Sequence, residues 1–149
     1  MTIENSIKNP VGILFLAVVA VFLGGCQSIG DIKKSDDLDR ALKAYEAAMR
    51  WNDPVAMLSY HKFADGEPVP LPEDYEELRV MEYNIIYPPV KSSPTNAQQM
   101  VEISYANINN QVVHKVKDRQ TWVYDKEIKV WRVTSPIPLP NPFLPAAGR

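Results

Sequence analysis

Apolar residues along this chain follow a helical repeat first and an alternating repeat later. Over residues 36–51 they recur at three- and four-residue steps, which places them on one stripe of an amphipathic helix. Asp36, Asp37 and Asp39 crowd the first turn, where carboxylates suit the exposed amides and the positive end of the helix dipole. The residues of the stripe, which we expect to be buried, are Leu38, Ala41, Leu42, Tyr45, Ala48 and Met49.

A second, shorter helix is predicted over residues 54–61. Asp53 can cap its first turn, and Pro54 suits the first helical position because proline has no N–H to leave unpaired. Because only residues 52 and 53 separate the two predicted helices, we expect them to form a V-shaped pair. The side chains that the second helix should bury are Val55, Met57, Leu58 and Tyr60.

Four antiparallel strands are predicted from residue 78 on, where the apolar repeat changes to two. Their expected ranges are 78–87, 100–108, 112–124 and 130–135. Asn109 and Asn110 are expected to form a hairpin turn, because asparagine tolerates a positive φ. The predicted fold class is therefore α+β, with the helix pair packed on an antiparallel sheet of about four strands.

The alternation also assigns faces, because successive side chains of a strand point to opposite sides of the sheet. Pro88 and Pro89 are expected to end the first strand, since proline cannot donate to the ladder. The residues expected on one face of that strand are Met81, Tyr83, Ile85 and Tyr87. The second strand is expected to hold Val101, Ile103 and Tyr105 on one side, and the closing strand holds Trp131 and Val133.

Residues 136–149 form a proline-rich tail that should be extended, near the polyproline II conformation. Two interpretations stay open. The tail packs its apolar residues across the domain as a strap, or it is a docking peptide for a partner protein. The apolar residues between the prolines are Ile137, Leu139, Phe143 and Leu144.

The N-terminal segment has the pattern of a secretion signal. Residues 11–23 are 13 apolar or small residues without charge. That length is too short to cross about 30 Å of hydrocarbon as a helix, but it fits the core of a signal peptide over residues 1–25. The next residues resemble the lipobox of bacterial lipoproteins, since a thioether lipid needs a cysteine sulfur and small residues admit the peptidase. They are Leu23, Gly24, Gly25 and Cys26.

The lipobox resemblance implies that Cys26 becomes the new N-terminus and carries several acyl chains, palmitate among them, on a tether of residues 26–35. Gln27 follows it, which resembles the outer-membrane sorting signal of Gram-negative lipoproteins. The domain proper, residues 36–135, is then expected at the periplasmic face of the outer membrane. The alternatives are a structural cysteine after an ordinary signal peptide, or a short membrane anchor.

Composition narrows the classes of function. A chain of 149 residues fits one globular domain, and its net charge of −2 argues against a nucleic-acid-binding protein. Its single cysteine excludes an internal disulfide and a thiolate zinc site. Residues 26–89 hold 7 basic and 13 acidic side chains, and residues 90–149 hold 8 and 4. Either these charges neutralise each other within the domain, or a basic sheet face docks an acidic partner.

Aromatic residues are spaced in a recognisable way along the predicted elements. The helix pair holds Tyr45, Tyr60 and residues 51–53, and the long strand and closing hairpin hold residues 117–122 and 131–133. This order resembles the nuclear transport factor two-like superfamily, which includes ketosteroid isomerase and many small bacterial lipoproteins. The resemblance implies a cone-like, curved sheet wrapped over the helices, a pocket for a small ligand and frequent dimers through the sheet. Its members include enzymes, carriers and structural modules, so the fold does not choose among them.

One candidate site lies on the long strand over residues 112–124. Alternation puts His114, Asp118, Gln120 and Trp122 on one face. If that face lines the cone, a desolvated Asp118 has the raised pKa that a general base needs.

With Tyr83 or Tyr105 nearby, the site would resemble the proton-transfer site of ketosteroid isomerase. The other interpretation pairs Asp118 and Arg119 with cross-strand neighbours and leaves His114 at a wet end of the sheet.

The two histidines have no paired metal-ligand spacing, and the glycines form no phosphate loop, so no metal or cofactor is expected. The leading hypothesis is a lipid-anchored, non-catalytic periplasmic module that binds an envelope protein or a small apolar ligand. The alternative is a small isomerase or hydrolyase that uses Asp118 or His114. A third interpretation is a purely structural module that forms a homodimer.

Overall fold

The computed structural model describes residues 10–141, and the side chains from residue 30 onward. The chain divides into two compact units, Met1–Asp36 and Asp37–Arg149. Helix α1 (Pro10–Arg50) contributes to both units. The remaining elements are α2 (Pro54–Ser59), the 3-10 helix η1 (Glu73–Glu77), β1 (Leu78–Ser93), β2 (Asn96–Asn107), β3 (Val113–Asp125) and β4 (Val130–Val133). Within the part of the chain that is described, no helix is both long enough and apolar enough to span a membrane.

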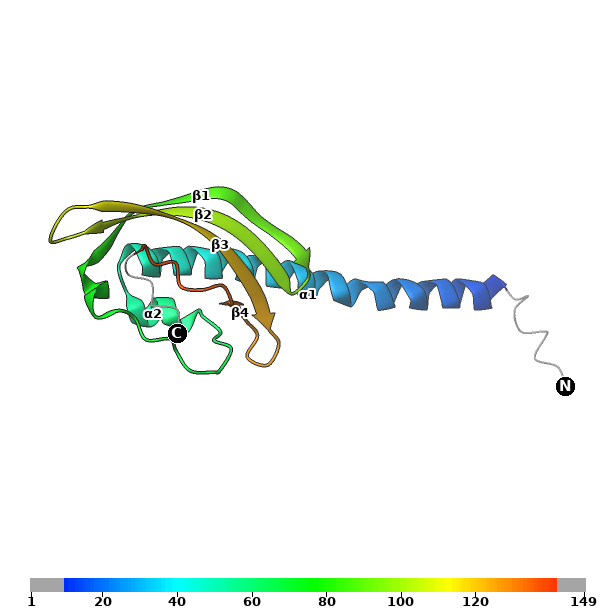
Figure 1. Ribbon diagram of the computed structural model, residues 1–149. Coiled ribbons are helices and arrows are strands. Elements are labelled where there is room, and N and C mark those ends of the chain that lie inside the picture. Colours follow the sequence, from blue (N-terminus) through cyan, green and yellow to red (C-terminus); the bar gives the residue numbers. More distant parts are fainter. Residues whose placement is uncertain (1–9, 142–149) are drawn as a thin grey trace. The chain divides into compact units, whose positions relative to one another are not determined.

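The four strands form one antiparallel sheet in the order β1-β2-β3-β4. Strands β2 and β3 pair without a break from Asn96↔Val123 to Ala106↔Val113. The sheet is open and curved, and it arches over residues 37–50 of α1 (Figure 1). The predicted class is confirmed: the fold is α+β, with a helix pair packed against a four-stranded antiparallel sheet.

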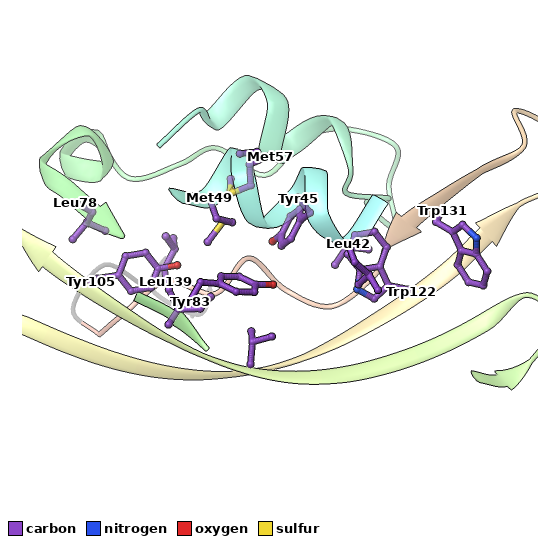
Figure 2. Packing of buried hydrophobic residues seen from close by; sticks show 14 of the residues in the cluster. Leu42, Tyr45, Met49, Met57, Leu78, Tyr83, Tyr105, Trp122, Trp131 and Leu139 are labelled. Carbon is purple, nitrogen blue, oxygen red and sulfur yellow. The ribbon is translucent and has the colours of Figure 1, made fainter. Parts of the chain in front are cut away.

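The core lies between α1 and the concave face of the sheet. Leu42, Tyr45 and Met49 point from the helix toward Tyr83 and Trp122 of the sheet (Figure 2). The predicted stripe is confirmed, because all of its members are buried except the half-buried Ala41. Aromatic rings fill much of this layer, where each removes a large apolar area from water.

Helix α2 begins as predicted, with the Ala56 N–H donating to Asp53 Oδ1 at 2.9 Å. The prediction that Val55 is buried is wrong, since its side chain is 79% exposed. Residues two apart on a helix lie on nearly opposite sides, so burying Met57 turns Val55 to the solvent. Helix α1 does not begin at Asp36 either. Residues 27–35 contain no proline and a single glycine, Gly30, so no strong helix breaker precedes Asp36.

Strand β1 differs from its prediction in length and in face. It continues through Pro88 and Pro89 to Ser93. It lies at the edge of the sheet, where a residue without an N–H is tolerated. Register shifts between Val80 and Glu82 and again between Ile85 and Tyr87 break the alternation. Tyr83 is therefore buried, whereas the other three residues predicted to share its face are exposed, namely Met81, Ile85 and Tyr87.

The turn between β2 and β3 forms at residues 108–112, but its positive φ falls on Gln111 and not on an asparagine. Asn107 explains the difference, because its Oδ1 accepts from the N–H groups of Asn109 and Asn110 at 2.9 and 3.2 Å. These bonds hold Asn109 and Asn110 in a turn with negative φ, so the positive φ that completes the chain reversal falls on the next residue, Gln111.

The proline-rich tail packs on the domain as far as it is described. Pro138, Leu139 and Pro140 are buried, and the Tyr105 hydroxyl donates to the Pro138 carbonyl. The strap interpretation is confirmed for these residues. Phe143 and Leu144 lie outside the described residues.

Candidate functional site

A hydrogen-bonded polar cluster lies inside the apolar core, on the concave face of β2 and β3. Its centre is Gln120, a fully buried side chain opposite Gln99 in the register of the two strands. Gln120 Nε2 donates to Asp118 Oδ2 at 2.8 Å and to the Tyr83 hydroxyl at 2.9 Å. Gln120 Oε1 accepts from Gln99 Nε2 at 2.6 Å and from Trp122 Nε1 at 3.3 Å. One amide thus ties together four side chains from three strands.

The direction of these bonds follows from the chemistry of the partners. An indole N–H can only donate, so Trp122 requires the oxygen of the Gln120 amide to face it. The nitrogen of that amide then faces Asp118 and Tyr83. Gln99 must in turn present its nitrogen to Gln120, which leaves its own oxygen pointing away.

Burial raises the pKa of Asp118 from its ordinary value of 3.8 to about 6, while the hydrogen bond from Gln120 lowers it. The cause is desolvation, which disfavours the charged form. Burial also raises the pKa of Tyr45 and of Tyr105, and the charge of Asp118 raises both further. The carboxyl group is therefore set among tyrosines rather than beside a cation.

The structure brings together four of the six residues predicted to share a pocket: Tyr83, Asp118, Gln120 and Trp122. Tyr105 lies opposite His114 in the sheet and bonds to the tail. His114 is half-buried and four residues from Asp118, which is about 13 Å along a strand. It therefore takes no part in the cluster.

The other histidine, His61, is buried beside the cluster, and no local sequence signal indicated its role. Its Nε2 lies 3.0 Å from the Tyr45 hydroxyl, and its ring stacks on Phe63 with centroids 5.7 Å apart. Burial lowers the pKa of His61 to about 4, although a hydrogen bond to the Ser135 backbone raises it. A bond that raises the pKa of an imidazole is one in which the ring donates, so neutral His61 donates a hydrogen bond to the Ser135 carbonyl and accepts one from the Tyr45 hydroxyl.

A cavity of about 450 Å³ opens beside His61. One wall is the segment of residues 61–64 with Val69 and Pro70, and the other wall is residues 134–137 with Leu139. The two walls are held together by backbone hydrogen bonds, among them Lys62 N–H to the Val133 carbonyl at 2.8 Å.

The polar side chains around this cavity bond mainly to the protein itself. The Lys62 ammonium pairs with Asp125 at 3.2 Å, and the Thr134 hydroxyl donates to the Thr121 carbonyl at 3.3 Å. Both ring nitrogens of His61 are also hydrogen-bonded, to Tyr45 and to the Ser135 backbone. The lining therefore offers mostly apolar surface. The apolar side chains that form it are Phe63, Ala64, Val69, Pro70, Pro136, Ile137 and Leu139.

Asp118 does not line this cavity, and the cavity involves none of the six residues predicted for a pocket. Among residues 30–141, no group of three or more His, Cys, Asp or Glu side chains is placed to hold a metal ion. Cys26, Leu23, Gly24 and Gly25 lie within α1, and their side chains are outside the described part. The chain matches no protein-family model, no curated protein and no solved structure.

Proposed function

We propose that this protein is a lipid-anchored binding module at the periplasmic face of the outer membrane, and that it takes a small apolar ligand in the cavity beside His61. The observation that supports an apolar ligand is the cavity of about 450 Å³, because the polar side chains that line it bond to the protein itself. Its volume lies within the roughly 300–1,000 Å³ that small-molecule sites occupy. The lipid anchor is carried by Cys26 and the residues before it.

The state of His61 supports an uncharged ligand. A pKa of about 4 keeps the imidazole neutral at the pH of a bacterial envelope, so His61 adds no charge to the lining of the cavity. The imidazole ring of His61 stacks on the ring of Phe63, so these two side chains present aromatic rather than polar surface. An apolar molecule gains about 25 cal/mol for each Å² of apolar surface that it buries in such a site.

The resemblance to the nuclear transport factor two-like superfamily is part of the proposal. It is supported by the order of two helices and four strands and by the curved sheet over α1 (Figure 1). In that superfamily the same layer holds ligands, and homodimers form through the sheet. The side chains on the inner face of β3 here bond to one another instead, and the cavity lies at the end of the sheet near β4.

One observation favours the second candidate function, a small isomerase or hydrolyase. The pKa of Asp118 is raised to about 6, which suits a general base near neutral pH. A base must also reach the proton that it removes, and Asp118 is 7% exposed and lies outside the cavity beside His61. We therefore place binding, and not proton transfer, at the centre of the proposal.

A tryptophan introduced at Ala64 is expected to fill the cavity and lower the affinity for apolar ligands at least tenfold. Ala64 is an exposed lining residue, so the larger ring enters the cavity without disturbing the core. The measurement is a fluorescence titration of residues 27–149 with N-phenyl-1-naphthylamine, a neutral apolar probe. We expect saturable one-to-one binding to the unsubstituted chain.

Ala47→Trp is the matched control, because it places the same ring at an exposed alanine of α1 away from the cavity. Its affinity for the probe should equal that of the unsubstituted chain. Binding that does not saturate, or that both variants weaken equally, would contradict the cavity as the ligand site. Capture of an envelope protein with no bound probe would favour a protein partner instead.

A further inference from the structure

A smaller groove lies on the convex face of the sheet, on the side away from the core. Its volume is about 240 Å³, and it shares no residue with the cavity beside His61. Three neighbouring strands contribute to it. The side chains that matter for its chemistry are Tyr87, Pro88 and Val90 of β1, Gln98 and Met100 of β2, and Arg119 of β3.

An extra residue in β1 shapes this groove. Tyr87 lies opposite Met100 and Val90 lies opposite Gln98, so β1 advances by three residues where β2 advances by two. In a regular strand, residues three apart point to opposite faces of the sheet. Here both are paired with residues of a single face of β2, so the bulge brings the side chains of Tyr87 and Val90 together on the convex face. Pro88 lies within the bulge, where its missing N–H is tolerated.

The two side chains that the bulge brings together are unusually exposed for their size. Tyr87 is 63% exposed and Val90 is 65% exposed, and the half-buried Met100 lies between them and β3. A single exposed apolar side chain is ordinary, but these two adjoin one groove. A ligand that covers them gains about 25 cal/mol for each Å² of apolar surface that leaves water.

Arg119 supplies the only charged side chain in the described lining. It lies opposite Met100, so its side chain is on the same convex face and borders the apolar part of the groove. Among the residues that the structure describes, its guanidinium makes no hydrogen bond and no ion pair. Glu102, two residues from Met100 along β2, is bonded to Lys115 at 3.3 Å instead. The groove therefore presents an accessible cation next to apolar surface, without a carboxylate in its lining.

These features describe an anion with a single charge and an apolar body. A guanidinium pairs with one carboxylate through two parallel N–H···O bonds, which fixes the direction of the ligand as well as its charge. A phosphate monoester carries nearly two negative charges, and one guanidinium would leave part of that charge uncompensated. Inorganic phosphate also has no apolar part to cover Tyr87 and Val90.

We infer that the convex-face groove binds a short-chain monocarboxylate, whose carboxylate pairs with the Arg119 guanidinium and whose apolar chain covers Tyr87 and Val90. The groove is separate from the cavity beside His61, and it takes a charged rather than an uncharged ligand. Either proposal can therefore fail without the other.

The test is a titration of the full chain, in zwitterionic detergent micelles, with sodium hexanoate at neutral pH and constant ionic strength. Nitrogen-15 correlation spectra report the Arg119 side-chain Nε–H and the Val90 backbone amide. We expect a saturable shift of both signals with one dissociation constant. Sodium acetate lacks the chain and n-hexanol lacks the charge, so each should bind about tenfold more weakly or less. The n-hexanol titration also reveals any effect of a ligand that enters the micelles.

Arg119→Gln is expected to lower the affinity for hexanoate about tenfold or more, because it removes the cation that pairs with the carboxylate. Lys117→Gln is the matched control, since Lys117 is exposed, shares the convex face of β3 and lies outside the groove. It should change the affinity by less than about twofold, because salt screens a charge at that distance. Val90→Ser should lower the affinity about threefold through the lost apolar contact. All three side chains are exposed, so these substitutions leave the core intact.

The inference is overturned if hexanoate gives no saturable shift, or if acetate or n-hexanol binds as tightly as hexanoate. It is also overturned if Arg119→Gln and Lys117→Gln lose affinity equally, since the positive charge would then attract the anion from a distance and not within the groove. Signals that shift with the protein concentration and not with hexanoate would mean that a second copy of the chain covers the groove, which overturns the inference as well.

Discussion

Replacing Gln120 by leucine is expected to lower the free energy of unfolding by about 4 kcal/mol at pH 8, because several buried polar groups lose their partners at once. Leucine has nearly the volume of glutamine, so the loss does not come from a cavity. The carboxylate of Asp118 loses its donor, and the Trp122 N–H and the Gln99 amide lose their acceptor. Each unsatisfied buried group costs about 1–3 kcal/mol.

The pH dependence of this loss identifies its cause. At pH 5 the carboxyl of Asp118 is mostly protonated in the folded protein, because its pKa is about 6. The uncompensated charge is then absent, and the loss caused by Gln120→Leu should fall to about 2 kcal/mol. Urea unfolding at pH 5 and pH 8 measures both values. Gln98→Leu, an exposed neighbour on the opposite face, should change neither by more than about 0.5 kcal/mol. Equal losses at the two pH values would contradict the buried charge.

Asp118→Asn is expected to act in the opposite direction and stabilise the protein at pH 8 by about 2 kcal/mol. The folded pKa of Asp118 is raised from 3.8 to about 6. The stability that this carboxyl contributes is therefore present in full below pH 3.8 and is lost as the pH rises through 6. The shift corresponds to about 3 kcal/mol at 1.36 kcal/mol for each pH unit. Asparagine keeps an oxygen for the Gln120 amide and avoids that loss, but its own buried N–H groups cost about 1 kcal/mol.

The unfolding midpoint of Asp118→Asn should therefore exceed that of the unsubstituted chain at pH 8 and equal or fall below it at pH 4. His61 supplies a second signature, because its pKa is lowered to about 4 from 6.5. The unfolded chain then binds the proton more readily, so this group removes stability as the pH falls from 6.5 to 4. In the unsubstituted chain the pH dependences of stability from Asp118 and His61 nearly cancel. Asp118→Asn removes the first, so the loss of stability that His61 causes as the pH falls should become visible. A variant that is less stable at pH 8 would mean that the carboxylate supports the fold.

The sequence predicted the parts of the fold that depend on local periodicity. The stripe from Leu38 to Met49 follows from helical spacing alone, and it packs against the sheet as expected. Alternation along β3 placed Asp118, Gln120 and Trp122 on one face, and the structure shows that this face is buried. Local pattern is sufficient to group these residues in both cases, because the helical and strand repeats alone decide which side chains share a side of the element.

The parts that the sequence did not predict depend on contacts between distant residues. The cavity beside His61 is built from residues 61–70 and 134–139, which are joined by the bridge of His61 with Val133. No spacing within either segment indicates the other. The same holds for Gln99, whose oxygen is left free only because Trp122 and Gln120 fix the direction of the amide. The length of β1 was missed because an edge strand tolerates Pro88 and Pro89 where an inner strand would end.

The most direct measurement is a native mass spectrum of the full protein, extracted gently from the membranes of its own cells. The proposed function predicts a chain that begins at Cys26 with the added mass of acyl groups, together with a non-covalent apolar ligand. The ligand should be missing from Ala64→Trp and present in Ala47→Trp. A chain that keeps residues 1–25 and carries neither acyl groups nor a ligand would contradict both the lipid anchor and the binding site beside His61.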